Sequence, residues 1–218
     1  YYRWIFRDTE WSGTAPGCSH PHTAENPKSI HSLRRMEGQL IDAGLTCRHT
    51  LQPDVSWMAN DVGPLLDEAG LKPGFVLLVP GSSASLPHKR WPYYSELAER
   101  LIEDGRQVVT VPGPDEMELC ANIPGATLTG GSFLDWFDLA GVVKAAAYIV
   151  GNDTGPSHLA AHMGMPGLAL FGSHTTVEKT GIKTVQFDAI EVEDLHKLPV
   201  ERIFETVKAG LTAHSNSV

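Results

Sequence analysis

The stretch AYIVGNDTGPSHLAA, residues 147–161, holds in one run the features that decide the fold. Its first four residues form an apolar run of the kind found in strands that are buried on both faces. Gly155 and Pro156 then open a helical segment, and Pro is favoured in the first turn of a helix because its missing N–H costs nothing there. A strand that passes directly into a helix is the unit of a parallel sheet covered by helices.

The same alternation of strands and helices extends to both sides of this stretch. Short apolar runs predict parallel strands at 75–79, 107–111, 126–128, 147–150 and 167–171, with an edge strand at 184–187. Amphipathic spacing and helix-opening residues predict helices at 31–43, 62–69, 91–103, 115–122, 133–144, 155–163 and 200–211. We therefore expect an α/β fold, a Rossmann-like parallel sheet with helices on both faces. An irregular loop is expected over 11–27, after a short aromatic segment at 1–6.

The length of the chain limits how many domains it can form. Its 218 residues suffice for one domain with an extension or for two small domains. We expect a complete Rossmann-like domain over residues 73–218, where the strands and helices alternate, and a separate N-terminal segment over residues 1–72. The chain begins Tyr1-Tyr2-Arg3, without an initiator Met or a signal peptide, which favours a piece of a longer protein.

Charge and cysteine usage narrow the function classes. With 26 acidic and 17 basic residues the net charge is −9, which argues against a broad nucleic-acid interface but allows a small cationic pocket. No apolar run approaches the roughly 20 residues that a membrane span needs. Cys18, Cys47 and Cys120 form no paired motif, so we expect no disulfide framework and a location in the reducing cytoplasm.

One short stretch has the composition of a metal site. Cys18, His20 and His22 lie close together in sequence, with His31 further on, and sulfur and imidazole are zinc ligands. Their spacing matches no standard site, and no fourth ligand stands out. We therefore favour a polar loop and expect no metal.

Ligands on parallel sheets bind beyond the carboxyl ends of the strands, so the residues after each predicted strand are the candidates for a site. After the strand at 75–79, the hydroxyls of Ser82 and Ser83 can donate to phosphate oxygens. Lys89 is a compact positive charge suited to a phosphate. An ordinary loop with a solvated lysine explains these residues equally well.

An acidic pair follows the next strand, which ends at Val111. Asp115 or Glu116 could accept hydrogen bonds from a ribose diol, as acids at this edge do in dinucleotide sites. The simpler alternative, that both complement the N-terminus of a helix, is slightly favoured from this stretch alone.

The loop after Val150 is the most specific candidate. The freed N–H groups at Gly155 make an anion site at a helix N-terminus, and Thr154 adds a hydroxyl. Asp153 is negative, so it suits sugar hydroxyls or a positioning role, and His158 lies one turn into the helix on the same side. The alternative is a capped helix with a packed histidine.

Two further stretches are weaker candidates. Residues 172–176 are rich in donors, but a polar turn is at least as good an interpretation. The aromatic stretch at 133–137 is more typical of a core than of a ligand platform.

The absence of several motifs argues against several enzyme classes. The sequence contains no G-x-G-x-x-G after a strand, which disfavours a nicotinamide-dependent oxidoreductase, and no P-loop. The nucleophile elbow G-x-S-x-G and the zinc motif H-E-x-x-H are absent as well.

Read together, these motifs resemble the C-terminal half of glycosyltransferase family 9, the ADP-heptose:lipopolysaccharide heptosyltransferases and their relatives. The resemblance rests on Pro80-Gly81-Ser82, on Lys89-Arg90-Trp91-Pro92, on residues 151–161 and on Leu170-Phe171-Gly172. It covers about residues 31–211 and implies half of a GT-B fold, in which two Rossmann-like halves face each other. The resemblance implies that residues 1–72 are the remnant of the N-terminal, acceptor-side domain with its linker, and that residues 73–218 are the C-terminal domain that binds the nucleotide sugar. The sequence departs from the family at 174–176, where a Pro-Thr-Asp-Pro-like turn is usual, and it shows no N-terminal glycine-rich loop or acidic general base.

The resemblance also implies roles for individual residues. Lys89 would contact the donor diphosphate and stabilise it as it leaves, with Ser82 and Ser83 nearby. Glu116 would bind the ribose, although Asp115 or Glu118 would also fit. The remaining roles fall on the loop that opens the helix at 155: phosphate contacts for Thr154 and Gly155, the donor sugar for Asp153, and support of the loop for His158.

The reaction implied is an inverting sugar transfer in which protein cations stabilise the leaving diphosphate and no cofactor is needed. The partners implied are a nucleotide sugar such as ADP-heptose and a lipopolysaccharide-type acceptor. Peripheral contact with the inner membrane is compatible with this role, and no nucleic-acid partner is expected. Because no general base is assigned in this chain, we expect the chain alone to be inactive. The alternatives are another GT-B enzyme, such as a sugar-nucleotide epimerase, and a non-catalytic nucleotide-binding module.

Overall fold

The computed structural model describes residues 9–23, 30–83 and 85–215. Contacts divide the chain into two compact units, one of residues 1–53 with 178–181 and the other of residues 54–177 with 182–218. The aromatic segment predicted at 1–6 lies outside the described residues. The division predicted at residue 72, into the remnant of one domain and a complete second one, stays a prediction.

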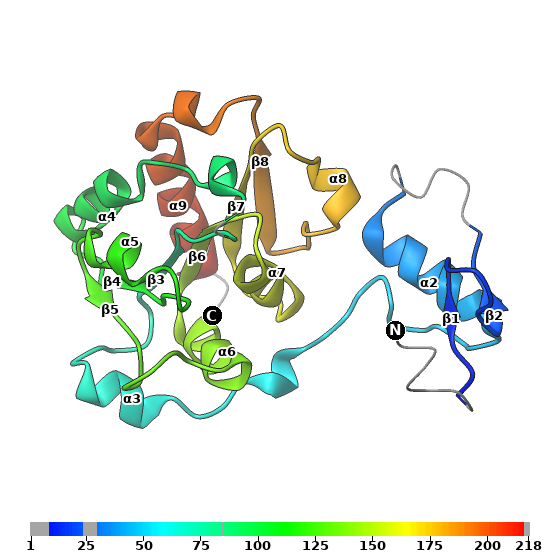
Figure 1. Cartoon of the computed structure of the whole chain (residues 1–218). Coiled ribbons are helices and arrows are strands. Elements are labelled where there is room, and N and C mark those ends of the chain that lie inside the picture. The colour runs from blue at the N-terminus through cyan, green and yellow to red at the C-terminus, as the bar shows by residue number, and fades with distance from the viewer. Residues whose placement is uncertain (1–8, 24–29, 84, 216–218) are drawn as a thin grey trace. The chain divides into compact units, whose positions relative to one another are not determined.

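The larger unit is built on a parallel sheet of six strands in the order β5-β4-β3-β6-β7-β8 (Figure 1). The strands are β3 Val76–Val79, β4 Val108–Thr110, β5 Ala126–Thr127, β6 Tyr148–Asn152, β7 Gly167–Phe171 and β8 Phe187–Glu191. The expected α/β fold is therefore confirmed. The edge strand predicted at 184–187 is wrong, because β8 begins at Phe187 and pairs with β7 from there.

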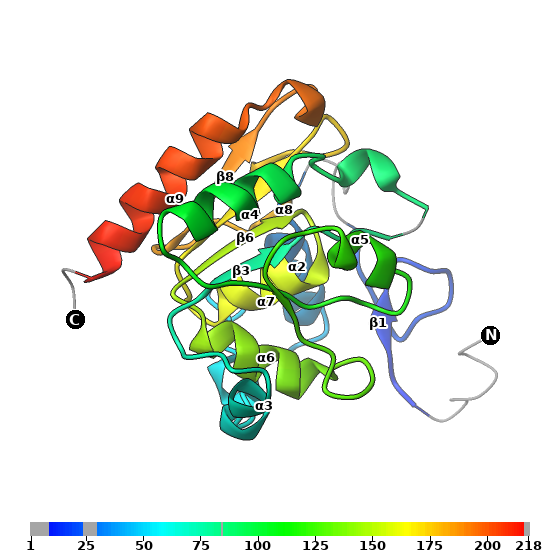
Figure 2. The same ribbon diagram turned by 90° about the vertical axis from the view of Figure 1, so that its left-hand side faces the viewer.

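Helices cover both faces of this sheet (Figure 2). One face packs against α4 and α9, and the other against α3, α6 and α7. The helices are α3 Gly63–Glu68, α4 Tyr94–Glu103, α5 Met117–Ala121, α6 Trp136–Ala145, α7 Gly155–His162, α8 Val177–Thr180 and α9 Val200–Ser215. The four residues of β3 are buried on both faces, as their uninterrupted apolar run predicts.

Among its described residues, the smaller unit contains helix α2, residues 178–180 of helix α8 and two short strands. Helix α2, Ser32–Asp42, confirms the segment predicted at 31–43. Strands β1 Ser12–Gly13 and β2 His20–Pro21 pair in parallel. The loop predicted at 11–27 therefore contains a short ladder that its composition does not indicate.

None of the helices in the described part of the chain has both the length and the apolar character needed to cross a bilayer.

Candidate functional site

Asn152, the last residue of β6, ties the ends of two neighbouring strands together. Its side chain is fully buried, and its amide donates to the carbonyl oxygens of Pro80 at 2.8 Å and Gly81 at 3.0 Å. Its Oδ1 accepts from the Trp91 backbone N–H and from the Tyr94 hydroxyl, both at 3.1 Å. Burial raises the pKa of Tyr94 well above its usual 10, so the hydroxyl stays a donor. Asn152 thus fixes the loop after β3 against the end of β6.

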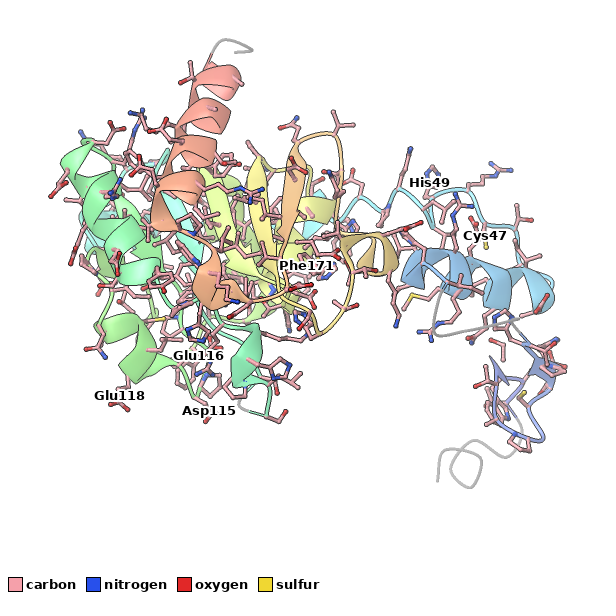
Figure 3. The ribbon with its side chains drawn as sticks, turned by 90° about the horizontal axis from the view of Figure 1, so that it is seen from above. Cys47, His49, Asp115, Glu116, Glu118 and Phe171 are labelled. Carbon is pink, nitrogen blue, oxygen red and sulfur yellow. The ribbon has the colours of Figure 1, made fainter. Side chains whose placement is uncertain are left out.

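Glu116 is the acid that points to this edge of the sheet. Its Oε2 accepts from the Gly113 N–H at 3.0 Å, and its carboxylate packs against Gly81, where a Cβ would come within 1.9 Å of Oε1. Asp115 and Glu118 are exposed, whereas Glu116 is half-buried (Figure 3). Of the three acids weighed from the sequence, Glu116 is the one that lines the pocket at the strand ends.

Helix α7 begins at this edge with a bare N-terminus. Thr154 is the N-cap residue, with extended backbone, and no side chain caps the helix among the described residues. The Thr154 hydroxyl turns back to the Asn152 carbonyl at 3.4 Å, and Ser157 donates to the same oxygen at 2.6 Å. Side-chain capping by Asp153 or Thr154, the simpler interpretation of this loop, is therefore not what the structure shows. The first N–H groups of α7 are available to an anion.

A pocket of about 420 Å³ lies between these elements. The pocket is lined by Ser82, Ser83, Glu116, Thr154 and Gly155, which are five of the eight site residues expected from the sequence. Its other lining residues are Val79, Gly81, Val111, Pro112, Gly113, Pro114, Phe133, Leu134, Asp135, Trp136, Leu139 and Pro156. Lys89, Asp153 and His158 form a separate charged cluster next to Thr154 rather than part of the wall.

The pocket also has an aromatic wall that sequence reasoning missed. The expectation that 133–137 belongs to the core is wrong, since Phe133 is 43% exposed and Trp136 is 53% exposed. Asp135 caps α6 by accepting from the Phe137 and Asp138 N–H groups, so these aromatics lie at the start of the helix, ahead of its buried part. The Trp136 indole reaches Gly155, where a Cβ would come within 2.9 Å of it.

The two serines of the β3 loop are engaged within that loop. The Ser82 hydroxyl donates to the Leu86 carbonyl at 3.0 Å and accepts from Arg90 Nε at 3.1 Å. Ser83 Oγ lies 2.9 Å from Ser85 Oγ. Contact of either hydroxyl with a phosphate stays a prediction.

Asp153 is the centre of the charged cluster. Its Oδ2 accepts from Lys89 Nζ at 2.9 Å and from His174 Nε2 at 2.9 Å, and its Oδ1 lies 3.2 Å from His158 Nε2. Burial alone would raise the pKa of this carboxyl, but the hydrogen bonds from His158, Lys89 and His174 outweigh it and hold the pKa well below its usual range. Asp153 is therefore ionised and its two oxygens are already well supplied with donors.

His174 lies in the loop 172–176, which the sequence offers as a weaker candidate with a polar turn as an equally good interpretation. The structure shows its side chain only 8% exposed and bonded to Asp153, a contact that the sequence does not predict. The signal available in the sequence was its position directly after the Leu170-Phe171-Gly172 strand end, at the same edge as Asp153.

The side chains considered as metal ligands each bond to a different partner instead of facing one another. Cys18 donates to the Gly13 carbonyl, His20 pairs with Glu10, and His22 Nδ1 lies 2.7 Å from Asp42 Oδ2. His31 accepts from the Leu33 N–H at the start of α2. Within the described ranges, no group of three His, Cys, Asp or Glu side chains comes together as a metal site would require.

The part of the chain that carries the pocket and the Asp153 cluster also matches known proteins. Residues 44–202, more than half of the chain, match the family described as glycosyltransferase family 9 (heptosyltransferase). The lipopolysaccharide heptosyltransferase 2 of Escherichia coli is 36% identical over 98 residues, which cover 39% of this chain and 28% of that protein. The match thus spans less than a third of the length of this curated relative.

Solved structures show the same fold at lower identity. The ADP-heptose lps heptosyltransferase II of E. coli superimposes with a TM-score of 0.64 at 20% identity, covering 91% of this chain and 67% of that chain. A glycosyl transferase family 9 protein from Veillonella parvula gives a TM-score of 0.70 at 18% identity, covering 88% and 63%.

Proposed function

The chain belongs to glycosyltransferase family 9, and from that premise we propose that it binds a nucleoside diphosphate sugar, ADP-heptose, at the carboxyl ends of β3, β4 and β6. The reaction we propose it serves is the inverting transfer of heptose to the inner core of lipopolysaccharide. The chain would provide the donor-binding part of this reaction. The observation that carries the proposal is one pocket bounded by the bare N-terminus of α7, the Glu116 carboxylate and an aromatic wall.

Each part of the pocket suits one part of such a donor. Glu116 offers a carboxylate to the ribose hydroxyls, and it reaches the pocket because Gly81 has no side chain in its way. The N–H of Gly155 and the dipole of α7 suit the diphosphate. The apolar walls, with Trp136 half exposed, suit the flat face of a base.

The chemistry we propose for this chain is stabilisation of the leaving group. Negative charge builds on the diphosphate as the bond to the anomeric carbon breaks, and preorganised donors lower the barrier to that step. Lys89 and the N-terminus of α7 supply such donors at neighbouring positions. Neither Asp153 nor Glu116 is assigned as the general base, because each carboxylate already accepts other hydrogen bonds. Asp153 accepts from Lys89, His158 and His174, and Glu116 accepts from the Gly113 N–H. We therefore propose that the chain alone binds the donor without turnover.

We also propose a cytoplasmic location, with peripheral contact with the inner membrane where the acceptor is presented. The free state of Cys18, Cys47 and Cys120 supports a reducing compartment.

Calorimetry with ADP, ADP-heptose, UDP and NAD tests the proposal. We expect ADP and ADP-heptose to bind at least about tenfold more tightly than UDP or NAD, a difference of about 1.4 kcal/mol. Glu116→Gln should weaken ADP binding by a similar factor, while Glu118→Gln, at an exposed acid in the first turn of α5, should leave it unchanged. Folded protein that binds neither ADP species would refute the assignment.

A further inference from the structure

The buried histidine after β7 is placed to act on the Asp153 carboxylate. The His174 side chain is 8% exposed, and its Nε2 lies 2.9 Å from Asp153 Oδ2. Its ring stacks on Phe171, with centroids 6.2 Å apart and planes at 8°, and the His88 ring packs edge-on against it at 5.9 Å. Packing therefore fixes the orientation of the ring as well as its position.

The environment of Nδ1 decides which tautomer donates. Nδ1 is buried and has no hydrogen-bond partner among the described residues. It faces the backbone of Gly172, where a Cβ would lie 3.6 Å away. A hydrogen on Nδ1 would be buried and unpaired, which costs about 1–3 kcal/mol. Nε2 faces the Asp153 carboxylate, which can only accept, so the neutral ring carries its hydrogen on Nε2 and donates it to Asp153.

His174 and Lys89 share one oxygen of this carboxylate. Both donate to Oδ2, while His158 lies at Oδ1. If Lys89 turns toward a diphosphate, the Asp153 carboxylate loses its cation while its side chain remains only 8% exposed. Leaving a buried carboxylate poorly paired is costly, so a second fixed donor on Oδ2 makes that movement easier.

We propose that His174 is a positioning residue, which holds Asp153 in place through its Nε2–H and so lets Lys89 pass from Asp153 to the donor diphosphate. This role rests on the proposed function, because it requires a diphosphate to bind beside Lys89. His174 itself touches neither the sugar nor the reacting atoms.

Two variants distinguish the effect of the His174 Nε2–H donor from that of the packing of its ring. His174→Phe keeps a ring against Phe171 and removes the donor, whereas His174→Gln loses the ring and keeps an N–H near the Nε2 position. We expect His174→Phe to weaken ADP binding about tenfold and His174→Gln to restore most of that loss. Adenosine, which has no diphosphate, should bind all three proteins alike. Weaker ADP binding by His174→Gln than by His174→Phe would overturn the proposal, because it would mean that packing matters and the donor does not.

A double-mutant cycle tests whether the effect passes through Lys89. In a Lys89→Ala background, His174→Phe should change ADP affinity by less than about threefold, since there is no lysine left to release. An unchanged tenfold loss in that background would overturn the proposal. Failure of the unmodified chain to bind ADP would overturn this role and the proposed function together, whereas tight ADP binding that is unaffected in His174→Phe would overturn this role alone.

Nitrogen NMR of the unmodified chain gives a readout that does not depend on the variants folding. We expect His174 Nε2 to carry the hydrogen and Nδ1 to be unprotonated, both before and after saturation with ADP. A protonated Nδ1, or loss of the Nε2–H hydrogen bond when ADP binds, would contradict the role.

Discussion

At the scale of single residues, Asn152 determines the geometry of the site. An asparagine side chain can donate twice and accept at its oxygen, and here both kinds of bond are made in a fully buried position. The partners come from the loop after β3 and from the segment that enters α4, so one side chain sets the distance between the strand ends. Asp153 follows directly in sequence, and its position depends on this anchor.

Asn152→Asp tests the anchor with almost no change in shape. The substitution places a carboxylate oxygen against the Pro80 and Gly81 carbonyls and removes two donors, so we expect the free energy of unfolding to fall by about 2–4 kcal/mol. Asn122→Asp is the control: it also removes an amide donor, the one that bonds to the Glu118 carbonyl, but at an exposed position, so we expect a loss of only about 1 kcal/mol. Denaturant titration measures both, and equal effects would contradict the anchoring role.

Asp153 gives stability a defined pH dependence. The pKa of its carboxyl is held below the ordinary 3.8 by its three donors, so the folded state keeps the charge to lower pH than the unfolded state does. The resulting stabilisation is present above about pH 4 and is lost as the pH falls from there toward the folded-state pKa. Unfolding free energies of the unmodified chain and Asp153→Asn should therefore differ by about 2–4 kcal/mol at neutral pH and converge in acid. A difference that grows below pH 4 would be inconsistent with this assignment.

At the scale of elements, the start of α6 supplies the aromatic wall of the pocket. The Asp135 cap ends the preceding loop and begins the helix at Trp136, so its first turn carries exposed rings while Leu139, Ala140, Val142 and Val143 face the core. The indole of Trp136 lies over Gly155, at the first turn of α7. Two helix beginnings thus meet at the pocket.

Trp136→Ala tests whether this wall contacts the nucleotide. Stacking of a base on an aromatic side chain contributes about 1–3 kcal/mol, so we expect ADP affinity to fall about tenfold. Trp57→Ala is the matched control, because Trp57 is 74% exposed and does not line the pocket. Equal ADP affinities in calorimetry of the two variants would place the base elsewhere.

The elements also show what could be predicted from the sequence. Buried strands with uninterrupted apolar runs were located well, and β7 was predicted at its observed bounds. Helix α4 begins at Tyr94, later than the predicted 91, and the residue before a proline, here Trp91 before Pro92, is disfavoured in helical backbone. The edge strand β8 is misplaced in the prediction because two of its five residues are the exposed acids Asp188 and Glu191, which weaken its apolar signal.

Some residues of the candidate site could be predicted from the sequence and others could not. Position after a strand predicts Thr154 and Gly155 as site residues, and Glu116 follows β4 and matches the family resemblance; the structure places all three in the pocket wall. Position after a strand also marks His174 as a candidate, but the contacts of His174 with Asp153 and of Trp136 with Gly155 join residues distant in sequence, which local patterns do not encode.

At the scale of the whole molecule, a net charge of −9 coexists with a site suited to an anion. The two are compatible because the site depends on local groups, the N-terminus of α7 and Lys89, and not on the overall charge. Parallel strands bring these groups to one edge of the sheet, although they are separated by more than 60 residues in sequence.

A crystal structure of the chain with ADP tests the central claim most directly. We expect the diphosphate at the Gly155 N–H with Lys89 turned toward it, and the ribose hydroxyls within about 3 Å of the Glu116 carboxylate. We also expect that His174 still donates to Asp153. ADP bound away from the ends of β3, β4 and β6, or with its ribose on another residue while Glu116 stays on Gly113 alone, would contradict that claim.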